Sequence, residues 1–194
     1  MEAIELYRKS NKNTEAAKLL AKIADDLNSR GVPPLLVKKI YVLAALEVDS
    51  YKQRVLDMEM NQITGQATGA TAQTLNSLIT TDINTSADKA LSNPWKGAEA
   101  FHFYLLTQRH FYQKDYKKAL KTAIRLKEYE KELGAKTVYG LVALAAYLNQ
   151  SYHECSKALV KLERLPETEV TMSERMKYEE LAISIFSNHS PSDG

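Results

Sequence analysis

The sequence predicts an all-α fold in which helix–turn–helix units stack as an α-solenoid. Apolar residues recur at intervals of three and four along most of the chain, the spacing that lines one face of a helix. Glycine and proline are scarce and fall between these periodic segments, as expected for helices joined by short turns. One pair of helical segments also recurs at a fixed spacing. That recurrence favours stacked repeats over the alternative, a plain helical bundle.

Residues 1–60 are predicted to form helical repeats. A first helix spans residues 2–9, and a second ends at Gly31 and the two prolines that follow it. A long third helix begins at those prolines and continues to about Met58. Its apolar positions step by three and four, so one face of this helix is predicted to be buried.

Helical periodicity fails in residues 61–92. This stretch is crowded with Thr, Ala, Gly, Asn and Ser, a composition that disfavours a packed core. Leu75, Leu78 and Ile79 allow one short helix within it. We predict a polar, flexible insertion or loop, and two interpretations stay open: a disordered segment, or an element that binds a partner.

Periodicity returns in residues 93–188. Asn93 is predicted to be the N-cap of a helix and Pro94 its first residue. After a tight turn, a second helix is predicted to run until Gly134. The next segment, residues 138–148, is apolar nearly all round, as expected of a buried inner helix.

Two capping boxes are predicted in the C-terminal part of the chain. Ser151 precedes Glu154 by three residues, and Thr171 precedes Glu174 by three residues, each before an apolar-periodic segment. Residues 189–194 carry no such segment and are predicted to form a disordered tail.

The repeat consists of two helical pairs offset by 36 residues. Tyr116 and Tyr152 each open a second helix after a short turn, and Ala119 and Cys155 occupy the same small-residue position three residues later. Ala17 marks a fainter, earlier copy. A small residue at this position lets paired helices approach closely. The pattern resembles the 34-residue tetratricopeptide unit, although the Trp, Gly and Tyr marks of its first helix are degenerate. Residues 93–188 are therefore predicted to be tetratricopeptide-like.

Composition and charge exclude several classes of protein. Hydrophobic residues make up 44% of the 194-residue chain, enough for a continuous core, and the formal net charge is only +2. That balance gives no whole-chain argument for nucleic acid or an anionic membrane. The longest apolar run, residues 138–148, is too short to span a bilayer. The first five residues have neither the basic head nor the apolar stretch of a signal peptide, and we predict a cytoplasmic location with no direct membrane insertion.

No group of residues predicts catalysis. The four histidines are scattered, and none has metal-site spacing with a matching acid. Cys155 is the single cysteine, so it forms no internal disulfide, and its small-residue position predicts a buried, inert thiol. The acidic residues form no evident pair in a cleft. We predict no enzymatic activity, no cofactor and no small-molecule substrate.

A basic stripe on one predicted helix is the main candidate for binding a partner. Its cations step by four, three and four residues: Lys114, Lys118, Lys121 and Arg125. Such a stripe suits an acidic partner. The alternative is a solvated face, with nucleic acid a weaker third interpretation. In the preceding helix, Tyr104 and Phe111 are candidate apolar anchors, together with Tyr112.

Four blocks of the sequence carry a resemblance to a known family: residues 13–20, 43–47, 93–103 and 178–183. The most specific block reads Trp-Lys-Gly-Ala-Glu-Ala-Phe-His-Phe from Trp95. Together they resemble the C-terminal helical region of the WD repeat-containing protein 35 family, a subunit of intraflagellar transport complex A.

The resemblance implies a function that helical periodicity cannot give. Members of this family carry two N-terminal β-propellers, a tetratricopeptide-like solenoid and a small zinc-binding end. They act as scaffolds in retrograde transport along the axoneme and in cilium assembly. The implied partners are other complex A subunits, and the implied locations are the cilium, axoneme and basal body. The family has no catalytic residues. No paired cysteines follow Phe186 here, so roles of the propellers and of the zinc end are not assigned to this chain.

Two functional hypotheses follow. The first is a scaffold segment that binds other complex A subunits. The alternative is a tetratricopeptide receptor for acidic peptide tails, of the co-chaperone or vesicle-coat type. That class needs Lys and Asn side chains on the first helices of successive repeats. The corresponding positions here are apolar: Phe103, Leu106, Tyr139 and Val142. This pattern counts against the receptor.

Overall fold

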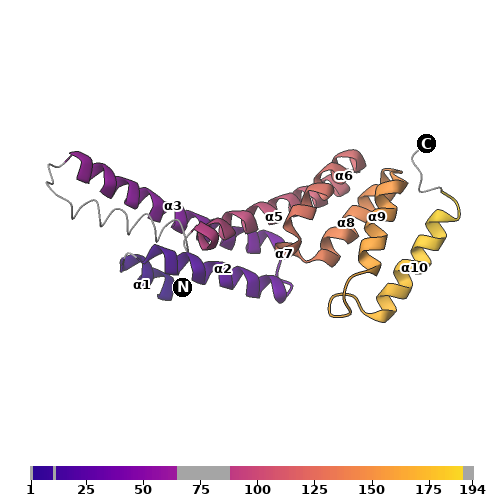
Figure 1. Cartoon of the computed structure of the whole chain (residues 1–194), viewed down its shortest axis with the longest axis horizontal. Coiled ribbons are helices and arrows are strands. Elements are labelled where there is room, and N and C mark those ends of the chain that lie inside the picture. Colours follow the sequence, from indigo (N-terminus) through magenta and orange to yellow (C-terminus); the bar gives the residue numbers. More distant parts are fainter. Residues whose placement is uncertain (1, 11, 65–87, 190–194) are drawn as a thin grey trace. The chain divides into compact units, whose positions relative to one another are not determined.

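The computed structural model describes residues 2–10, 12–64 and 88–189, and it divides into two compact units, residues 1–99 and 100–194. Within the described residues every regular element is a helix, and the ribbon consists of helices joined by short turns (Figure 1). The predicted all-α class is confirmed. Each unit is described below by itself.

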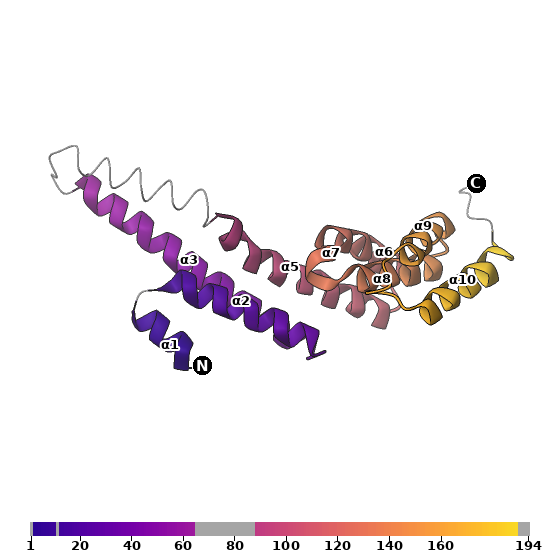
Figure 2. The ribbon, with the colours of Figure 1, turned by 60° about the horizontal axis from the view of Figure 1, so that its bottom comes forward.

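The first unit is built on an antiparallel helix pair. Helix α2 (Asn13–Ser29) and helix α3 (Pro34–Thr64) lie side by side, as Figures 1 and 2 both show, and α1 (Glu2–Lys9) packs on α2. The α2 face in this pair is made mostly of alanine, so the two backbones approach closely. Its buried members include Ala16, Ala17 and Ala24. The bounds of α1 and α2 agree with those predicted, whereas α3 continues past about Met58 to Thr64, into the stretch predicted to be a loop.

Helix α5 (Asp88–Tyr112) begins earlier than the sequence predicts. The predicted N-cap at Asn93 is wrong, because the helix already starts at Asp88 and Pro94 lies inside it. A proline in a helix interior removes one backbone hydrogen bond. Pro94 is among the most completely buried side chains, so packing of its ring offsets part of that loss.

The second unit contains the C-terminal part of α5 and the helices that follow it. These are α6 (Tyr116–Arg125), the 3₁₀ turn η2 (Leu126–Tyr129), α7 (Glu130–Leu133), α8 (Ala135–Leu148), α9 (Tyr152–Glu163) and α10 (Met172–Phe186). One core cluster joins α6, α8, α9 and α10. The last three helices lie side by side in Figures 1 and 2.

The repeated small-residue position lies in the core of each unit. Ala119 is 0% exposed, Cys155 is 1% exposed and Ala17 is 2% exposed. Ala119 and Cys155 belong to the core cluster of the second unit, and Ala17 contacts the buried Val48 in the first. Close helix packing at these positions is what the tetratricopeptide-like repeat predicts, and that fold is confirmed.

Three details of the second unit differ from prediction. The helix expected to run unbroken to Gly134 is divided into α6, η2 and α7, and Gly134 has a φ of 81°. The capping box at Ser151 is wrong, because the Ser151 hydroxyl accepts from Asn149 while Glu154 pairs with two lysines. Helix α8 is not buried all round, since Leu144 is 47% exposed.

The second predicted capping box is present. The Thr171 hydroxyl accepts from the Glu174 backbone N–H, and the Glu174 carboxylate accepts from the Thr171 backbone N–H. Within the predicted tail, the His189 backbone N–H donates to the Ile185 carbonyl. The predictions for residues 65–87 and 190–194 lie outside the described residues.

Candidate functional site

The basic stripe lies on the exposed face of α6 and on the turn before it. Lys114, Lys118, Lys121 and Arg125 are all exposed, and Lys117 joins them on the same face. Lys114 has a φ of 57° in the turn. Positive φ is uncommon for a lysine and is favoured here by the tightness of the connection between α5 and α6. We call these five residues the α6 basic face.

Asp115 is the acidic group at the start of the α6 basic face. It is the N-cap of α6, and its carboxylate accepts from the Lys118 backbone N–H at 3.1 Å. The same carboxylate lies 2.7 Å from the Lys118 ammonium, and these contacts hold the pKa of Asp115 below its ordinary value. Asp115 thus neutralises one of the five cations, which leaves a net positive surface.

Arg125 is held in place by an aromatic ring. Its guanidinium carbon lies 4.6 Å from the centre of the Phe103 ring on α5. The Phe103 ring in turn lies 6.1 Å from that of the buried Tyr129. A cation over an aromatic face is attracted by the ring quadrupole. Arg125 therefore presents its remaining donors from a fixed position.

The two candidate anchors on α5 are only half-buried, and each already packs within the unit. The Tyr104 ring meets the Phe101 ring edge-on at 6.4 Å, and Phe111 packs against the core cluster. Tyr112, at the end of α5, is 92% exposed. Of the predicted aromatic anchors, Tyr112 is the one fully accessible to a partner.

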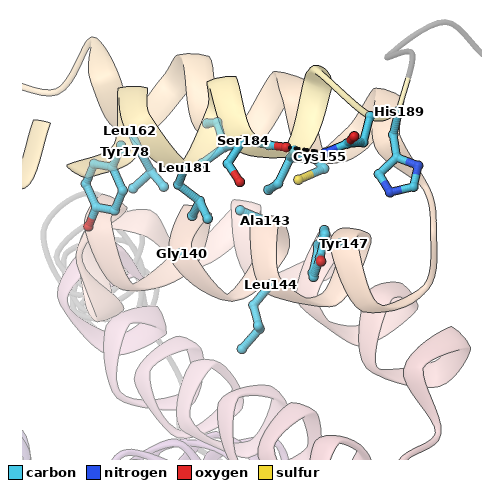
Figure 3. A pocket seen from close by; sticks show the side chains of 13 residues that line it. Gly140, Ala143, Leu144, Tyr147, Cys155, Leu162, Tyr178, Leu181, Ser184 and His189 are labelled. Atoms are coloured by element: carbon cyan, nitrogen blue, oxygen red, sulfur yellow. Dashed lines mark hydrogen bonds between the residues drawn. The ribbon is translucent and has the colours of Figure 1, made fainter. Parts of the chain in front are cut away.

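An apolar pocket of about 430 Å³ lies between α8 and α10, with α9 as its floor. Figure 3 shows the α10 side chains Tyr178 and Leu181 on one side and those of α8 on the other. Leu144, Tyr147 and Leu181 line it and are each more than 40% exposed. We call it the α8–α10 pocket. Sequence reasoning missed it, although the apolar residues all round residues 138–148 were a signal that this helix has a second apolar side.

Polar groups line one end of the α8–α10 pocket. The Asn188 side-chain amide donates to the Ser184 carbonyl at 3.2 Å, the bond drawn in Figure 3. The His189 ring stacks on Tyr152 with the ring centres 4.3 Å apart. Apolar walls with a few polar groups at one end suit a short protein segment as well as a small molecule.

The described residues offer neither a metal site nor a reactive thiol. They contain no group of three His, Cys, Asp or Glu side chains placed to hold a metal ion. Cys155 is 1% exposed, and burial raises the pKa of its thiol, so the reactive thiolate is disfavoured. None of the described helices is long and apolar enough to cross a membrane. What the surface offers is a basic face and an apolar pocket, both suited to contacts with another chain.

Comparison with known proteins gives the family. Residues 92–193, just over half of the chain, match the family model described as IFT121-like, TPR repeats. Residues 1–50 match the model described as WD repeat-containing protein 35, TPR repeats. The chain belongs to the IFT121-like family of TPR-repeat proteins. The predicted family resemblance is therefore confirmed.

Individual relatives agree along the entire chain. The chain is 40% identical over 193 residues to WD repeat-containing protein 35 of Homo sapiens. It is 39% identical over 193 residues to the proteins of the same name from Rattus norvegicus and Mus musculus. The alignments cover 100% of this chain and 16% of each relative. The chain thus spans about one-sixth of the length of the curated relatives that it matches.

Proposed function

We propose that this chain is a protein-binding scaffold segment of intraflagellar transport complex A. The observation that carries the proposal is the 40% identity along the whole chain to WD repeat-containing protein 35. The resemblance to that family implies a scaffold subunit of the complex. The stacked helix pairs support it, because solenoid repeats present extended surfaces to partners.

Two surfaces of the second unit are proposed to bind partners. The α6 basic face offers a net positive patch to an acidic segment of another subunit, and the α8–α10 pocket offers apolar side chains to a hydrophobic anchor. Tyr112 adds an exposed aromatic next to the turn that carries Lys114. Tyr104 and Phe111 are half-buried and pack within the unit, and we propose that they hold α5 in place beside this surface.

The proposed cellular role rests on the family resemblance. We propose that the segment acts in retrograde ciliary transport and in cilium assembly, in the cytoplasm and at the cilium, axoneme and basal body. Other complex A subunits are the proposed partners. The segment is proposed to act without catalysis, cofactor or small-molecule substrate, since the residues described offer contact surfaces rather than a reactive centre.

A receptor for acidic peptide tails is the second candidate function. The α6 basic face favours it. Its cations, however, lie on the second helix of a repeat, whereas such receptors present them from first helices. The first-helix positions Tyr139 and Val142 are 8% and 0% exposed, so they cannot hold a peptide carboxylate. The scaffold is therefore the function that these positions favour.

Co-expression with the other complex A subunits, one at a time, tests the proposal. The expected result is stable co-elution of the chain with at least one subunit on size-exclusion chromatography. If the folded chain elutes alone in every combination, the segment is a spacer, and binding belongs to other parts of the longer protein.

A further inference from the structure

The α6 basic face is a surface whose exposure does not depend on further helices of a longer chain. In a solenoid each repeat contacts only its neighbours, so helices beyond the next repeat do not reach it. The repeat that follows α5 and α6 is formed by α8 and α9, and with it in place Lys118, Lys121 and Arg125 are still exposed. An occupant of this face therefore comes from outside the stack of repeats.

The next repeat shows that the fold does not require these cations. Helix α9 stands 36 residues after α6, and the turn before it has the same backbone, since Gln150 has a φ of 61° where Lys114 has 57°. The side chains differ, because Gln150 replaces Lys114, and Glu154 replaces Lys118 and pairs with Lys157 at 3.0 Å. The excess of positive charge is thus a property of α6 and not of the repeat.

The cations of the α6 basic face lie in one row. Lys118, Lys121 and Arg125 are separated by three and four residues, so they share one side of the helix. Lys118 is paired with Asp115, whereas no acidic group in the described part of the chain pairs with Lys121. Ile124, next to the row, is 38% exposed. The face therefore combines aligned positive charge with one accessible apolar side chain.

The spacing of this row matches a second helix. The rise from Lys118 to Lys121 is roughly 4.5 Å and that from Lys121 to Arg125 roughly 6 Å, at about 1.5 Å per residue. A helix that lies alongside α6 presents carboxylates three and four residues apart with the same rises. An extended segment places the side chains of one face roughly 6.7 Å apart and loses register along the row. Arg125 cannot follow that shift, because its guanidinium is held over the Phe103 ring.

We infer that the α6 basic face binds a helix of a partner protein whose Glu or Asp residues step by three and four along one side. These carboxylates pair with the row of cations, and an apolar residue beside them covers Ile124. Arg125 determines the specificity, since a guanidinium holds a carboxylate through two parallel hydrogen bonds and an ammonium does not. The inference rests on the proposed binding role of this face and adds the conformation and the register of the bound segment.

Two labelled helical peptides test the inference by fluorescence anisotropy with the full chain. Both are built from the same alanine, leucine, glutamine and glutamate residues. In the aligned peptide the glutamates step by three and four along one side, and in the scrambled peptide they are distributed all round the helix. The aligned peptide is expected to bind at least about five-fold more tightly, because each exposed ion pair contributes up to a factor of about five.

Three variants locate the binding. Arg125→Lys keeps the charge and is expected to weaken the aligned peptide about five-fold while leaving the scrambled peptide unchanged. Arg125→Glu is expected to abolish the preference for the aligned peptide. Lys161→Glu is the matched control, because Lys161 is exposed at the equivalent position of α9, 36 residues later, and this variant is expected to keep the preference.

The outcomes separate this inference from the scaffold function. Equal binding of the two peptides, binding of neither, or loss of the preference in Lys161→Glu would overturn the inference. Each of these results leaves the scaffold function standing if the chain still co-elutes with a complex A subunit. A chain that prefers the aligned peptide but elutes alone with every subunit supports the inference and contradicts the scaffold function.

Discussion

Single residues in α8 separate the buried side of this helix from its accessible side. Ala145 is 0% exposed, whereas its neighbour Leu144 is 47% exposed and lines the α8–α10 pocket. A charge introduced at the buried position has neither water nor a partner, and an uncompensated buried charge is strongly destabilising.

Ala145→Asp is predicted to lower the free energy of unfolding by roughly 4 kcal/mol. Urea unfolding followed by circular dichroism measures the effect. Leu144→Asp is the control, and its midpoint is expected to stay close to that of the wild type. An unchanged unfolding curve for Ala145→Asp would contradict the burial of α8 in the core.

The ion pair between Lys136 and Glu174 predicts a dependence of stability on pH. The Lys136 ammonium lies 2.7 Å from the Glu174 carboxylate and, with two hydrogen bonds from Thr171, lowers the pKa of Glu174 from 4.5 to about 2. A carboxyl whose pKa is lower in the folded state stabilises the fold above its unfolded pKa. That contribution is lost as the pH falls from about 4.5 towards 2.

Glu174→Gln keeps the capping box but removes the charge. The difference between wild type and variant in the free energy of unfolding is predicted to be largest at neutral pH and to shrink below pH 4.5. Urea titrations at pH 7 and pH 3 measure it. A difference that is equal at both pH values would mean that the ion pair with Lys136 contributes no stability.

At the level of elements, two glycines in helices predict opposite effects of the same substitution. A Cβ at Gly97 in α5 would lie 2.5 Å from Cε1 of Tyr41, whose ring is 4% exposed and whose hydroxyl donates to Asp25. A Cβ at Gly140 in α8 would meet no atom within 4 Å.

Gly97→Ala is predicted to destabilise the chain by roughly 2 kcal/mol, because the Tyr41 ring must move from a packed position. Gly140→Ala is predicted to stabilise it by about 0.5 kcal/mol, because alanine favours a helix interior. Thermal unfolding of both variants measures the contrast. Equal shifts in the same direction would contradict the packing of α5 against α3 through Gly97.

Element type was predictable from sequence, whereas element ends were less so. The apolar spacing and the glycines predicted the ends of α2, α8 and α10 to within a few residues, because these signals are local. The start of α5 at Asp88 was missed, since burial of Pro94 is a tertiary effect. The capping box at Ser151 failed for a similar reason: Glu154 is drawn to Lys127, which is distant in sequence.

The candidate site was predictable only in part. A charge stripe is visible in sequence, so four of the five cations of the α6 basic face could be named in advance. The degree to which Tyr104 and Phe111 pack into the unit depends on neighbouring helices, so it could not be predicted from the sequence. The α8–α10 pocket was missed because it needs three helices, and their mutual packing is not a local property.

At the scale of the whole molecule, repeat architecture connects fold and function. Repeating a helix pair builds a core without long-range strand pairing, and it leaves the outer faces free to differ in charge and apolarity. In the second unit those faces carry the α6 basic face and the α8–α10 pocket. The function therefore depends on surface chemistry that the repeat itself does not dictate.

Size-exclusion chromatography of the chain co-expressed with complex A subunits, as wild type and as the Lys118→Glu/Arg125→Glu variant, tests the scaffold function most directly. Both positions are exposed, so the variant is expected to fold and to keep its helical circular dichroism spectrum. The wild type is predicted to co-elute with a subunit and the variant to elute alone. Co-elution of both would contradict binding through the α6 basic face, and elution of both alone would contradict the scaffold function.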